Sequence, residues 1–298
     1  MKITAIIVTY NGRKWVDRCL GSLRNSSVGV DVFVIDNGST DQTVPYIKEN
    51  YPEADVFASK ENLGFAKANN IGIKRALERG ADYVFLLNQD AWVEAGTLGS
   101  LIQTFSDDPS AGIAAPVQTN GEGTALDAYF TAYLSDAVIS DLYLHTVKDY
   151  YSLPFLNAAA WLISSECIKR VGGFDTSLFF HYGEDINYCQ RVLFHHYKIV
   201  LNTKCIFHHD REFRFGKEKE YRKAIMAKNP FYKDNVLYGD INEPFDINTL
   251  LRDQYKGLFL AVLCLSWKKV KKHRLLIRNL FTIKTSRALN TAGGLVWL

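Results

Sequence analysis

One acidic residue, Asp90, comes just after a run of apolar residues that predicts a buried strand. Residues 83–87, Tyr-Val-Phe-Leu-Leu, have the pattern of a central strand in a parallel sheet, buried on both faces. Ligands of open α/β sheets bind beyond the carboxyl ends of the strands, so Asp90 lies where a site is expected. A carboxylate there suits a hard divalent cation that also contacts substrate phosphates. The alternative is that Asp90 only starts a turn or caps the following helix.

Three further polar loops are predicted to lie at the same edge of the sheet as Asp90. They are residues 9–12 (Thr-Tyr-Asn-Gly), 36–41 (Asp-Asn-Gly-Ser-Thr-Asp) and 62–65 (Asn-Leu-Gly-Phe), and each follows a predicted strand. Parallel strands bring their carboxyl ends to one edge, so these loops should meet. Taken singly, each is ordinary turn-forming sequence. Together they predict a polar crevice with two acids, an aromatic ring and several amides.

The elements that must position these loops alternate between strand and helix patterns, which predicts βαβ units and a parallel sheet covered by helices. The expected strands are residues 3–9, 32–35, 55–58 and 83–87, and the expected helices are residues 13–24, a segment after 41, and 66–79. No G-x-G-x-x-G follows the first strand and no Walker lysine loop is present. Dinucleotide and P-loop interpretations therefore lose their usual support.

The composition is that of an ordinary globular protein. The 298 residues carry a net charge of +3, which is too small to indicate a nucleic-acid partner. The five cysteines are scattered and include no Cys-x-x-Cys pair, which favours a reducing compartment and argues against a cysteine zinc site. The N-terminal apolar run is typical of a first strand rather than a signal peptide. The longest later apolar stretch, residues 257–267, is shorter than the roughly 20 residues of a membrane span, so we expect a cytoplasmic protein without a transmembrane helix.

A series of short motifs runs along the chain. The series is Val-Thr-Tyr-Asn (8–11), Val-Ile-Asp-Asn-Gly-Ser-Thr-Asp (34–41), Asn-Leu-Gly-Phe-Ala (62–66), Asn-Asn-Ile-Gly (69–72), Leu-Asn-Gln-Asp (87–90), Val-Gly-Gly-Phe-Asp (171–175), Phe-Phe-His-Tyr-Gly-Glu-Asp (179–185), Cys-Gln-Arg (189–191) and Ile-Phe-His-His (206–209). In this order they resemble the motifs of the family 2 glycosyltransferases, and most of all those of the bacterial rhamnosyltransferase-like branch. Several spaced motifs that agree are far more specific than any one of them.

The resemblance implies the GT-A fold, an α/β architecture with a Rossmann-like, mostly parallel sheet flanked by helices. We expect residues 1–212 to form one catalytic domain that binds the nucleotide sugar and the acceptor. Residues 213–298 are expected to form a mainly helical, basic C-terminal extension, with helices at residues 221–228 and 248–267.

The reaction implied is transfer of a sugar from a nucleoside diphosphate to an acceptor hydroxyl. Negative charge builds on the departing diphosphate and an alcohol is a poor nucleophile, so the site should offer a cation to the first and a base to the second. We expect a UDP- or dTDP-sugar as donor, with a rhamnosyl donor favoured by the branch, and Mg²⁺ or Mn²⁺ as cofactor. The acceptor would be a growing glycan or a lipid-linked saccharide.

The metal site is assigned through two motifs. Asp90 resembles the last acid of the family's Asp-x-Asp motif, while Asn88 takes the place of the first acid and brings no charge. Two adjacent histidines, His208 and His209, follow a predicted strand at residues 204–207 and must point to opposite faces, so only one can join the metal or the diphosphate. By motif position we expect His208. The alternative is that both histidines serve only the surface or the packing.

The nucleotide is expected to meet the first two loops. Asp36 would accept a hydrogen bond from the imide N–H of uracil or thymine, and Thr9 and Tyr10 would line the base pocket. The alternative for Asp36 is a turn-forming role that satisfies its own loop amides, and Asp41 is expected to cap a helix. The residues expected to bind the nucleotide sugar are Thr9, Tyr10, Asn11, Asp36, Asn62, Gly64, Asn69 and Asn88.

An acid pair, Glu184 and Asp185, opens a predicted helix that runs to about Phe194. Acids in a first helical turn are stabilised by the helix dipole whatever their function. The aromatic residues just before the pair would suit a sugar, and in the family such a pair supplies the general base. We assign that role to Asp185, with Glu184 beside it, and expect a single displacement with inversion of configuration. Asn187 departs from the family's Glu-Asp-x-Asp pattern.

The C-terminal region concentrates cations among apolar residues. Its cations include Lys268, Lys269, Lys271, Lys272, Arg274, Arg278, Lys284 and Arg287. Such a segment is usually a solvated helix face. The alternatives are an interfacial anchor on anionic lipid at the inner face of a membrane, which would suit an enzyme that extends a lipid-linked glycan, or self-association into a homo-oligomer.

Two rival functions remain open. A sugar-nucleotide nucleotidyltransferase would also use a Rossmann-like sheet and a metal carboxylate, but it should carry a basic, glycine-rich loop after the first strand, which residues 9–12 do not provide. A non-catalytic protein that binds sugar nucleotides or glycans is favoured by Asn88 and Asn187, which replace acids of the family pattern.

Overall fold

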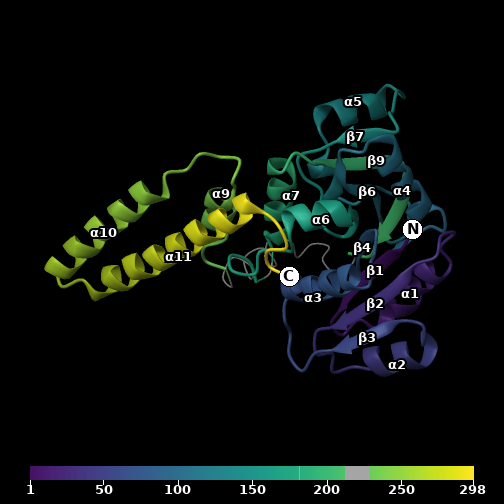
Figure 1. Ribbon diagram of the computed structural model, residues 1–298, viewed down its shortest axis with the longest axis horizontal. Coiled ribbons are helices and arrows are strands. Elements are labelled where there is room, and N and C mark those ends of the chain that lie inside the picture. Colours follow the sequence, from purple (N-terminus) through teal and green to yellow (C-terminus); the bar gives the residue numbers. More distant parts are fainter. Residues whose placement is uncertain (181, 212–228) are drawn as a thin grey trace.

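A computed structural model describes residues 1–180, 182–211 and 229–298. The predicted helix at residues 221–228 and His181 of the acid-pair motif lie outside the described residues. Within them, the chain forms an α/β domain around one sheet, from which a helical hairpin extends (Figure 1).

The sheet is parallel in its N-terminal half and mixed beyond it. Its strands are β1 (Ile3–Thr9), β2 (Asp31–Asp36), β3 (Asp55–Ala58), β4 (Tyr83–Asn88), β5 (Ala91–Val93), β6 (Ala111–Asn120), β7 (Tyr150–Ser152), β8 (Ala160–Ser164) and β9 (Lys198–His209), in the order β3-β2-β1-β4-β8-β6-β9-β5 with β7 on β9. Strands β3, β2, β1 and β4 run parallel, and β8 lies antiparallel between β4 and β6. The first four predicted strands are confirmed, whereas β9 is longer than the expected segment at residues 204–207.

Strand β4 is buried on both faces, as its sequence predicts. Val84 and Leu86 pack into a core cluster on one face of the sheet, and Phe85 and Leu87 pack into a second cluster on the other. This alternation follows from the pleat, which points successive side chains to opposite faces. The strand therefore fixes the position of the turn that carries Asp90.

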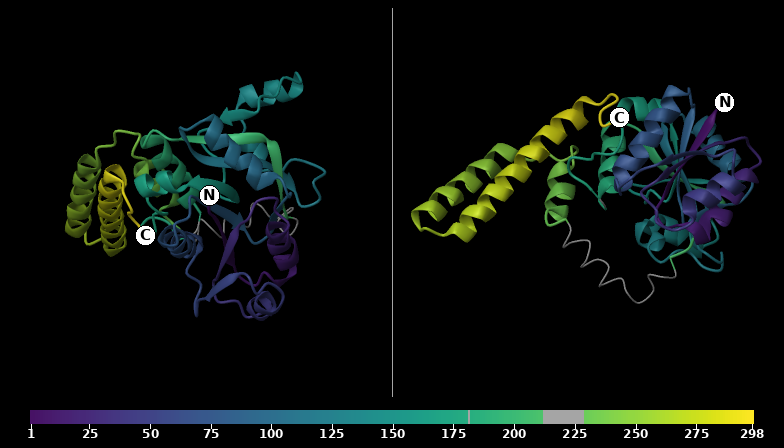
Figure 2. Two further views of the ribbon diagram at one scale, coloured as in Figure 1. Left: turned by 45° about the vertical axis from the view of Figure 1, so that its right-hand side comes forward. Right: turned by 90° about the horizontal axis from the view of Figure 1, so that it is seen from below.

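Helices cover the two core clusters from opposite sides (Figure 2). The helices are α1 (Val16–Arg24), α2 (Thr43–Asn50), α3 (Phe65–Glu78), α4 (Thr97–Asp107), α5 (Asp136–Tyr143), α6 (Ser165–Val171), α7 (Glu184–Phe194), α9 (Tyr232–Gly239), α10 (Ile247–Leu263) and α11 (Trp267–Ala292). Helices α3, α6 and α7 contribute to the first cluster, and α1 and α4 to the second. The helices predicted near residues 13–24, 66–79 and 184–194 are confirmed.

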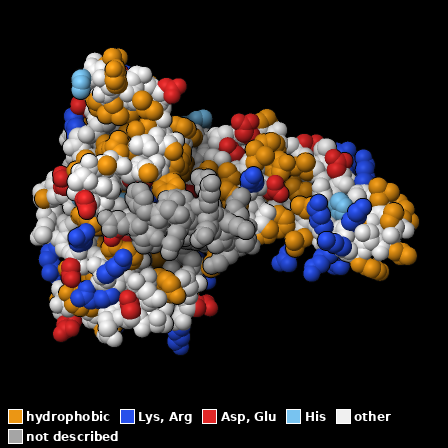
Figure 3. All heavy atoms as spheres, turned by 180° about the vertical axis from the view of Figure 1, so that it is seen from behind, with side chains coloured by type: hydrophobic (Ala, Val, Ile, Leu, Met, Phe, Trp, Pro, Cys, Tyr) orange, Lys and Arg blue, Asp and Glu red, His pale blue; other side chains and the backbone are white. Residues whose placement is uncertain are grey.

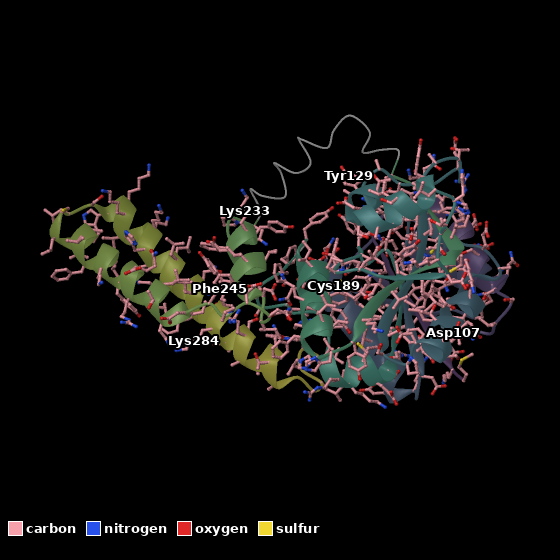
Figure 4. All side chains as sticks on the ribbon, turned by 90° about the horizontal axis from the view of Figure 1, so that it is seen from above. Asp107, Tyr129, Cys189, Lys233, Phe245 and Lys284 are labelled. Atoms are coloured by element: carbon pink, nitrogen blue, oxygen red, sulfur yellow. The ribbon has the colours of Figure 1, made fainter. Side chains whose placement is uncertain are left out.

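Helices α10 and α11 form an antiparallel hairpin that extends away from the α/β domain (Figures 1 and 2). Its base is held by a third apolar cluster, in which Ile277, Leu280 and Ile283 of α11 pack with Leu178 and Phe179. Lys233 and Phe245 lie near this base (Figure 4). None of the described helices is long and apolar enough to cross a membrane.

The chain end returns to the α/β domain after α11. The side-chain amide of Asn70 on α3 donates to the backbone oxygens of Phe174 (2.8 Å) and Trp297 (3.1 Å). Buried Asp175 accepts hydrogen bonds from Ser286 and Asn290 of α11. The C-terminal region is thus joined to residues 174–179 by polar as well as apolar contacts.

Candidate active site

Asp90 lies in the short turn between β4 and β5, where it is 6% exposed. Its Oδ1 is 3.2 Å from Nε2 of His209, which is 2% exposed at the end of β9. Antiparallel pairing of β5 with β9 sets Ala91 opposite His209 and brings the turn against this strand end. A carboxylate and an imidazole, two groups that bind divalent metals, are therefore in contact at the predicted edge of the sheet.

The two adjacent histidines point to opposite faces, as expected for a strand. His208 has its Nδ1 3.0 Å from Oγ1 of Thr119, and its ring stacks on Trp92 with centroids 5.8 Å apart. The choice between the two histidines differs from the prediction: motif position favoured His208, but the imidazole beside Asp90 belongs to His209.

The second ring nitrogen of His209 is also occupied. Its Nδ1 is 2.8 Å from Nε2 of Gln118 and accepts from Nε of Arg211 at 3.2 Å. With two donors on Nδ1, a neutral imidazole carries its proton on Nε2 and donates it to Asp90. The other amide atom, Oε1 of Gln118, is buried and has no hydrogen-bond partner among the described residues. A half-turn of this amide would put an acceptor against Nδ1, and if Arg211 also stopped donating to Nδ1, the proton could move there and free Nε2 to bind a cation.

Arg211 connects this pair to the acid motif. It forms an ion pair with Oδ2 of Asp127 at 3.3 Å, and its charge opposes the rise in the pKa of Asp185 that burial causes. Burial, followed by the negative charge of Asp185, raises the pKa of Tyr133 to about 12, and Arg211 opposes that rise. Hydrogen bonds therefore link Asp90, His209 and Arg211, and Arg211 is the charge of this group that acts on Asp185.

Arg211 was not among the predicted site residues. It lies two residues after His209, and the period-2 alternation of a strand sends such residues to the same face. Extending the strand pattern by two residues would have indicated it.

The acid pair opens α7 as predicted, after Gly183 in the left-handed conformation (φ 95°). Burial raises the pKa of both acids above their ordinary values, and the charge of Asp185 raises that of Glu184 further. Backbone N–H groups of Ile186 and Ala158, together with Arg211, oppose the rise at Asp185. Oε2 of Glu184 is buried without a hydrogen-bond partner in the part of the chain that is described. Asp185 is therefore the member of the pair that ionises more readily.

The carboxylate of Asp36 accepts hydrogen bonds from its own loop and from Thr9. Oδ2 accepts from the hydroxyls of Thr9 (2.8 Å) and Ser39 (2.5 Å), and Oδ1 accepts from the backbone N–H groups of Gly38 (3.1 Å) and Ser39 (2.8 Å). Four hydrogen bonds match the capacity of a carboxylate. This is the turn-forming alternative of the sequence analysis, and a contact with a base would require one of these bonds to open. Asp41 accepts from the backbone N–H of Thr43, the first residue of α2, but the N-cap residue of this helix is Gln42, so Asp41 lies one residue before the predicted capping position.

Loop 9–12 is held against its neighbours by side-chain amides. Gln89 accepts from the backbone N–H of Tyr10 (2.9 Å) and donates to its carbonyl oxygen (3.2 Å), and Asn11 accepts from the N–H of Thr40 (2.8 Å). The ring of Tyr10 is exposed. Tyr10 is therefore a fixed aromatic surface available for stacking, whereas the side chain of Asn11 connects two loops.

The remaining predicted residues divide between loop, strand and helix. Oδ1 of Asn62 accepts from the N–H of Gly64, whose φ of 79° and close approach to the carbonyl oxygen of Phe180 exclude a side chain. Asn69 is buried and donates to the carbonyl of Phe65 in its own helix (3.0 Å). Asn88 ends β4 and pairs in register with Val8 of β1.

A surface pocket joins Asn62 to the loop before the acid pair. It is lined by Glu61, Asn62, Leu63, Lys67, Thr176, Phe179 and Phe180. Phe180 is 65% exposed, so the pocket offers an aromatic face close in sequence to Asp185.

Comparison with known proteins identifies the family. Residues 4–172 match the sequence profile of the family described as Glycosyl transferase family 2. The match spans more than half of the chain, so the chain belongs to this family.

Two curated relatives share a sugar in their names. The N-acetylglucosaminyl-diphospho-decaprenol L-rhamnosyltransferase of Mycobacterium tuberculosis is 25% identical over 219 residues, which are 64% of this chain and 70% of that one. The dTDP-rhamnosyl transferase RfbF of Shigella flexneri is 26% identical over 194 residues, 64% of this chain and 63% of that one. Across these two and the Bacillus subtilis protein EpsH, the chain spans between 41% and 70% of the relative's own length.

Among solved structures, a mannosyltransferase from Pyrobaculum calidifontis, in complex with GDP-Man and Mn²⁺, has a TM-score of 0.56 at 17% identity. The match covers 97% of this chain and 86% of that one. At this identity the likeness shows the fold, and the predicted GT-A fold is confirmed.

Proposed function

We propose that the protein transfers a sugar from a UDP- or dTDP-sugar, with dTDP-rhamnose the favoured donor, to a hydroxyl of a growing glycan in the cytoplasm. The observation that carries the proposal is one connected network: Asp90 contacts His209, His209 contacts Arg211, and the charge of Arg211 acts on Asp185. Family membership supports the reaction class, and the two rhamnosyl relatives support the donor.

Asp90 and His209 are the proposed ligands of a Mg²⁺ or Mn²⁺ ion. Mg²⁺ is commonly held by one or two carboxylates together with substrate phosphates, so two protein ligands suffice when a diphosphate completes the coordination. Among the described residues no group of three or more His, Cys, Asp or Glu could hold a metal. The buried oxygen of Gln118, which has no partner among the described residues, fits as well, since it can accept the Nδ1 proton of a metal-binding His209 once Arg211 no longer donates to Nδ1. The cation would stabilise the charge of the departing diphosphate.

Asp185 is the proposed general base. It would take the proton of the acceptor hydroxyl while that oxygen bonds to the anomeric carbon and the bond from this carbon to the diphosphate breaks. One displacement of this kind inverts the configuration. Burial raises the pKa of Asp185 toward the neutral range, which makes the carboxylate a better base, while Arg211 keeps it ionisable. Glu184, which is buried, would keep its proton and hold the start of α7.

The two substrates would meet between the loops and α7. We propose that Tyr10 stacks on the nucleotide base, with Thr9 and Asn88 nearby, and that Asp36 shapes this loop rather than reading the base directly. The pocket beside Phe180 is proposed for the sugar groups, because an exposed ring suits the apolar face of a saccharide.

The test is release of nucleoside diphosphate from UDP-sugars and dTDP-rhamnose with and without Mn²⁺. We expect slow, Mn²⁺-dependent release without acceptor, fastest from dTDP-rhamnose, and none from Asp185→Asn above the background without enzyme. Binding without turnover would instead support the non-catalytic alternative, which Asn88 and Asn187 favour. A thermal-shift screen of the same donors would show which ones bind the folded state.

A further inference from the structure

The far end of the α10–α11 hairpin exposes large apolar side chains. Phe259 is 64% exposed, Leu265 76% and Trp267 74%. On α10 the exposed residues Tyr255, Phe259, Val262 and Leu263 recur at helical spacing and form one stripe. Nothing in the described part of the chain covers this stripe, and exposed apolar clusters of this kind mark contact surfaces.

Cations surround the same end of the hairpin. Six of them, Lys268, Lys269, Lys271, Lys272, Arg274 and Arg278, fall within eleven residues, and the sequence has no acid after Asp253. None of the six forms an ion pair within the described residues, whereas Lys198 and Lys204 of the α/β domain pair with Asp108 and Asp149. Figure 3 shows Lys and Arg side chains gathered near this end beside hydrophobic ones.

The two helices of the hairpin, which carry this surface, pack closely against each other. His273 of α11 has its Nδ1 2.9 Å from Oε1 of Gln254 on α10, and a side chain on Gly257 would collide with the His273 ring. The two helices are therefore in close contact. At the base, α11 packs on Leu178 and Phe179 of the α/β domain.

We propose that the hairpin end, residues 255–278, docks on an anionic lipid bilayer. Phe259, Leu263 and Trp267 would enter the interface while the six cations contact the head groups, the two parts of an interfacial membrane helix. Charge complementarity favours an anionic bilayer over the other partners. The same cations on a second copy of the chain would repel these, and an apolar protein partner would not need them. The proposal goes beyond the proposed reaction, and the bilayer contact does not depend on catalysis.

The test is co-sedimentation of the full chain with vesicles of phosphatidylcholine alone or with added phosphatidylglycerol. We expect binding only to the anionic vesicles and a decrease with salt. Neutralising Lys268, Lys271 and Lys272 to Gln should lower the partition coefficient about fivefold per cation, or about a hundredfold in total. The matched control neutralises three exposed lysines of the α/β domain, Lys48, Lys60 and Lys74.

A second variant tests the apolar half of the surface. Phe259→Ser, Leu263→Ser and Trp267→Ser together should abolish binding while the unfolding temperature and dTDP affinity stay unchanged, since these side chains are exposed. Equal binding to neutral and anionic vesicles, or wild-type binding by either triple variant, would overturn the proposal. So would sedimentation equilibrium that shows a dimer lost in the apolar variant with no vesicle binding by the wild type. Because dTDP binding is measured separately, failure here leaves the proposed reaction intact.

Discussion

The carboxyl edge of the sheet and the end of the hairpin differ in the burial and the partners of their polar side chains. At the edge, Asp36, Asp90 and His209 are buried and hydrogen bonded to other residues of the site. At the hairpin end, Lys271 and Trp267 are exposed, and the six cations between Lys268 and Arg278 form no ion pair among the described residues, although Lys256 pairs with Asp253. A buried hydrogen-bonded network holds its groups in one geometry, which suits a small ligand. Exposed cations and apolar side chains without such partners suit contact with a large surface.

This contrast predicts two independent sets of effects. Substitutions at the sheet edge should change donor binding, rate or pH dependence and leave vesicle binding unchanged. Substitutions at the hairpin end should do the reverse. A single substitution that changed both catalysis and vesicle binding would contradict this comparison. The substitutions below test it further.

The largest effect is expected from Asp185→Asn. Loss of the proposed base should lower transfer about 10²- to 10⁴-fold, while dTDP affinity measured by calorimetry stays near the wild-type value. Asp136→Asn is the matched control, because Asp136 is also an acid in the first turn of a helix but is exposed on α5. Unchanged transfer by Asp185→Asn would remove this residue from the base role.

The adjacent histidines give an internally controlled pair. His209→Ala should weaken Mn²⁺-dependent dTDP binding at least about tenfold, because it removes a proposed ligand. His208→Ala should have little effect, since its ring packs against Thr119 and Trp92 on the other face. Equal losses in the two variants, measured by calorimetry in the presence of Mn²⁺, would contradict the assignment.

Arg211→Gln should shift the pH dependence of transfer. Arg211 lowers the pKa of Asp185, so its removal should raise that pKa further and move the acid limb of kcat/KM to higher pH. The limb should already lie above the ordinary range of an aspartate in the wild type, because burial raises this pKa. A pH profile of Arg211→Gln that overlays the wild-type profile would show that the two charges do not interact, and Arg252→Gln on α10 is the distant control.

Glu184 should make stability depend on pH. Burial raises its folded-state pKa, so between the ordinary and the raised value the folded state binds more protons than the unfolded state. The free energy of unfolding should then fall as pH rises through this window, by up to about 1.4 kcal/mol per pH unit. Glu184→Gln should flatten this slope, measured by urea unfolding from pH 4 to 9, whereas an unchanged slope would assign it to other groups.

Much of the parallel half of the fold could be predicted from periodicity. Residues 83–87 are uniformly apolar because helices cover both faces, and the helix that begins at Glu184 has a clear 3.6-residue pattern. The positions of Asp90 and Asp185, just after the strand and at the start of the helix, follow from these patterns, while their roles in the site stay predictions.

The choice between His208 and His209 could not be predicted. It depends on the register of β9, which is longer than its apolar pattern suggests and pairs with β6 through two register shifts. A one-residue difference in register reverses every side chain of a strand. Likewise, the sequence does not show that the carboxylate of Asp36 is filled by its own loop, or that Asn70 joins α3 to Trp297, because these are contacts made in three dimensions.

The central claim is that Asp90 and His209 hold a cation against the diphosphate of the donor. Calorimetric titration of dTDP and UDP into the wild type and Asp90→Ala, with and without Mn²⁺, tests it most directly. We expect tight binding only for the wild type with Mn²⁺, and binding by Asp90→Ala that is weak and independent of the metal. Binding by the wild type that ignores Mn²⁺, or a normal metal dependence in Asp90→Ala, would contradict the claim.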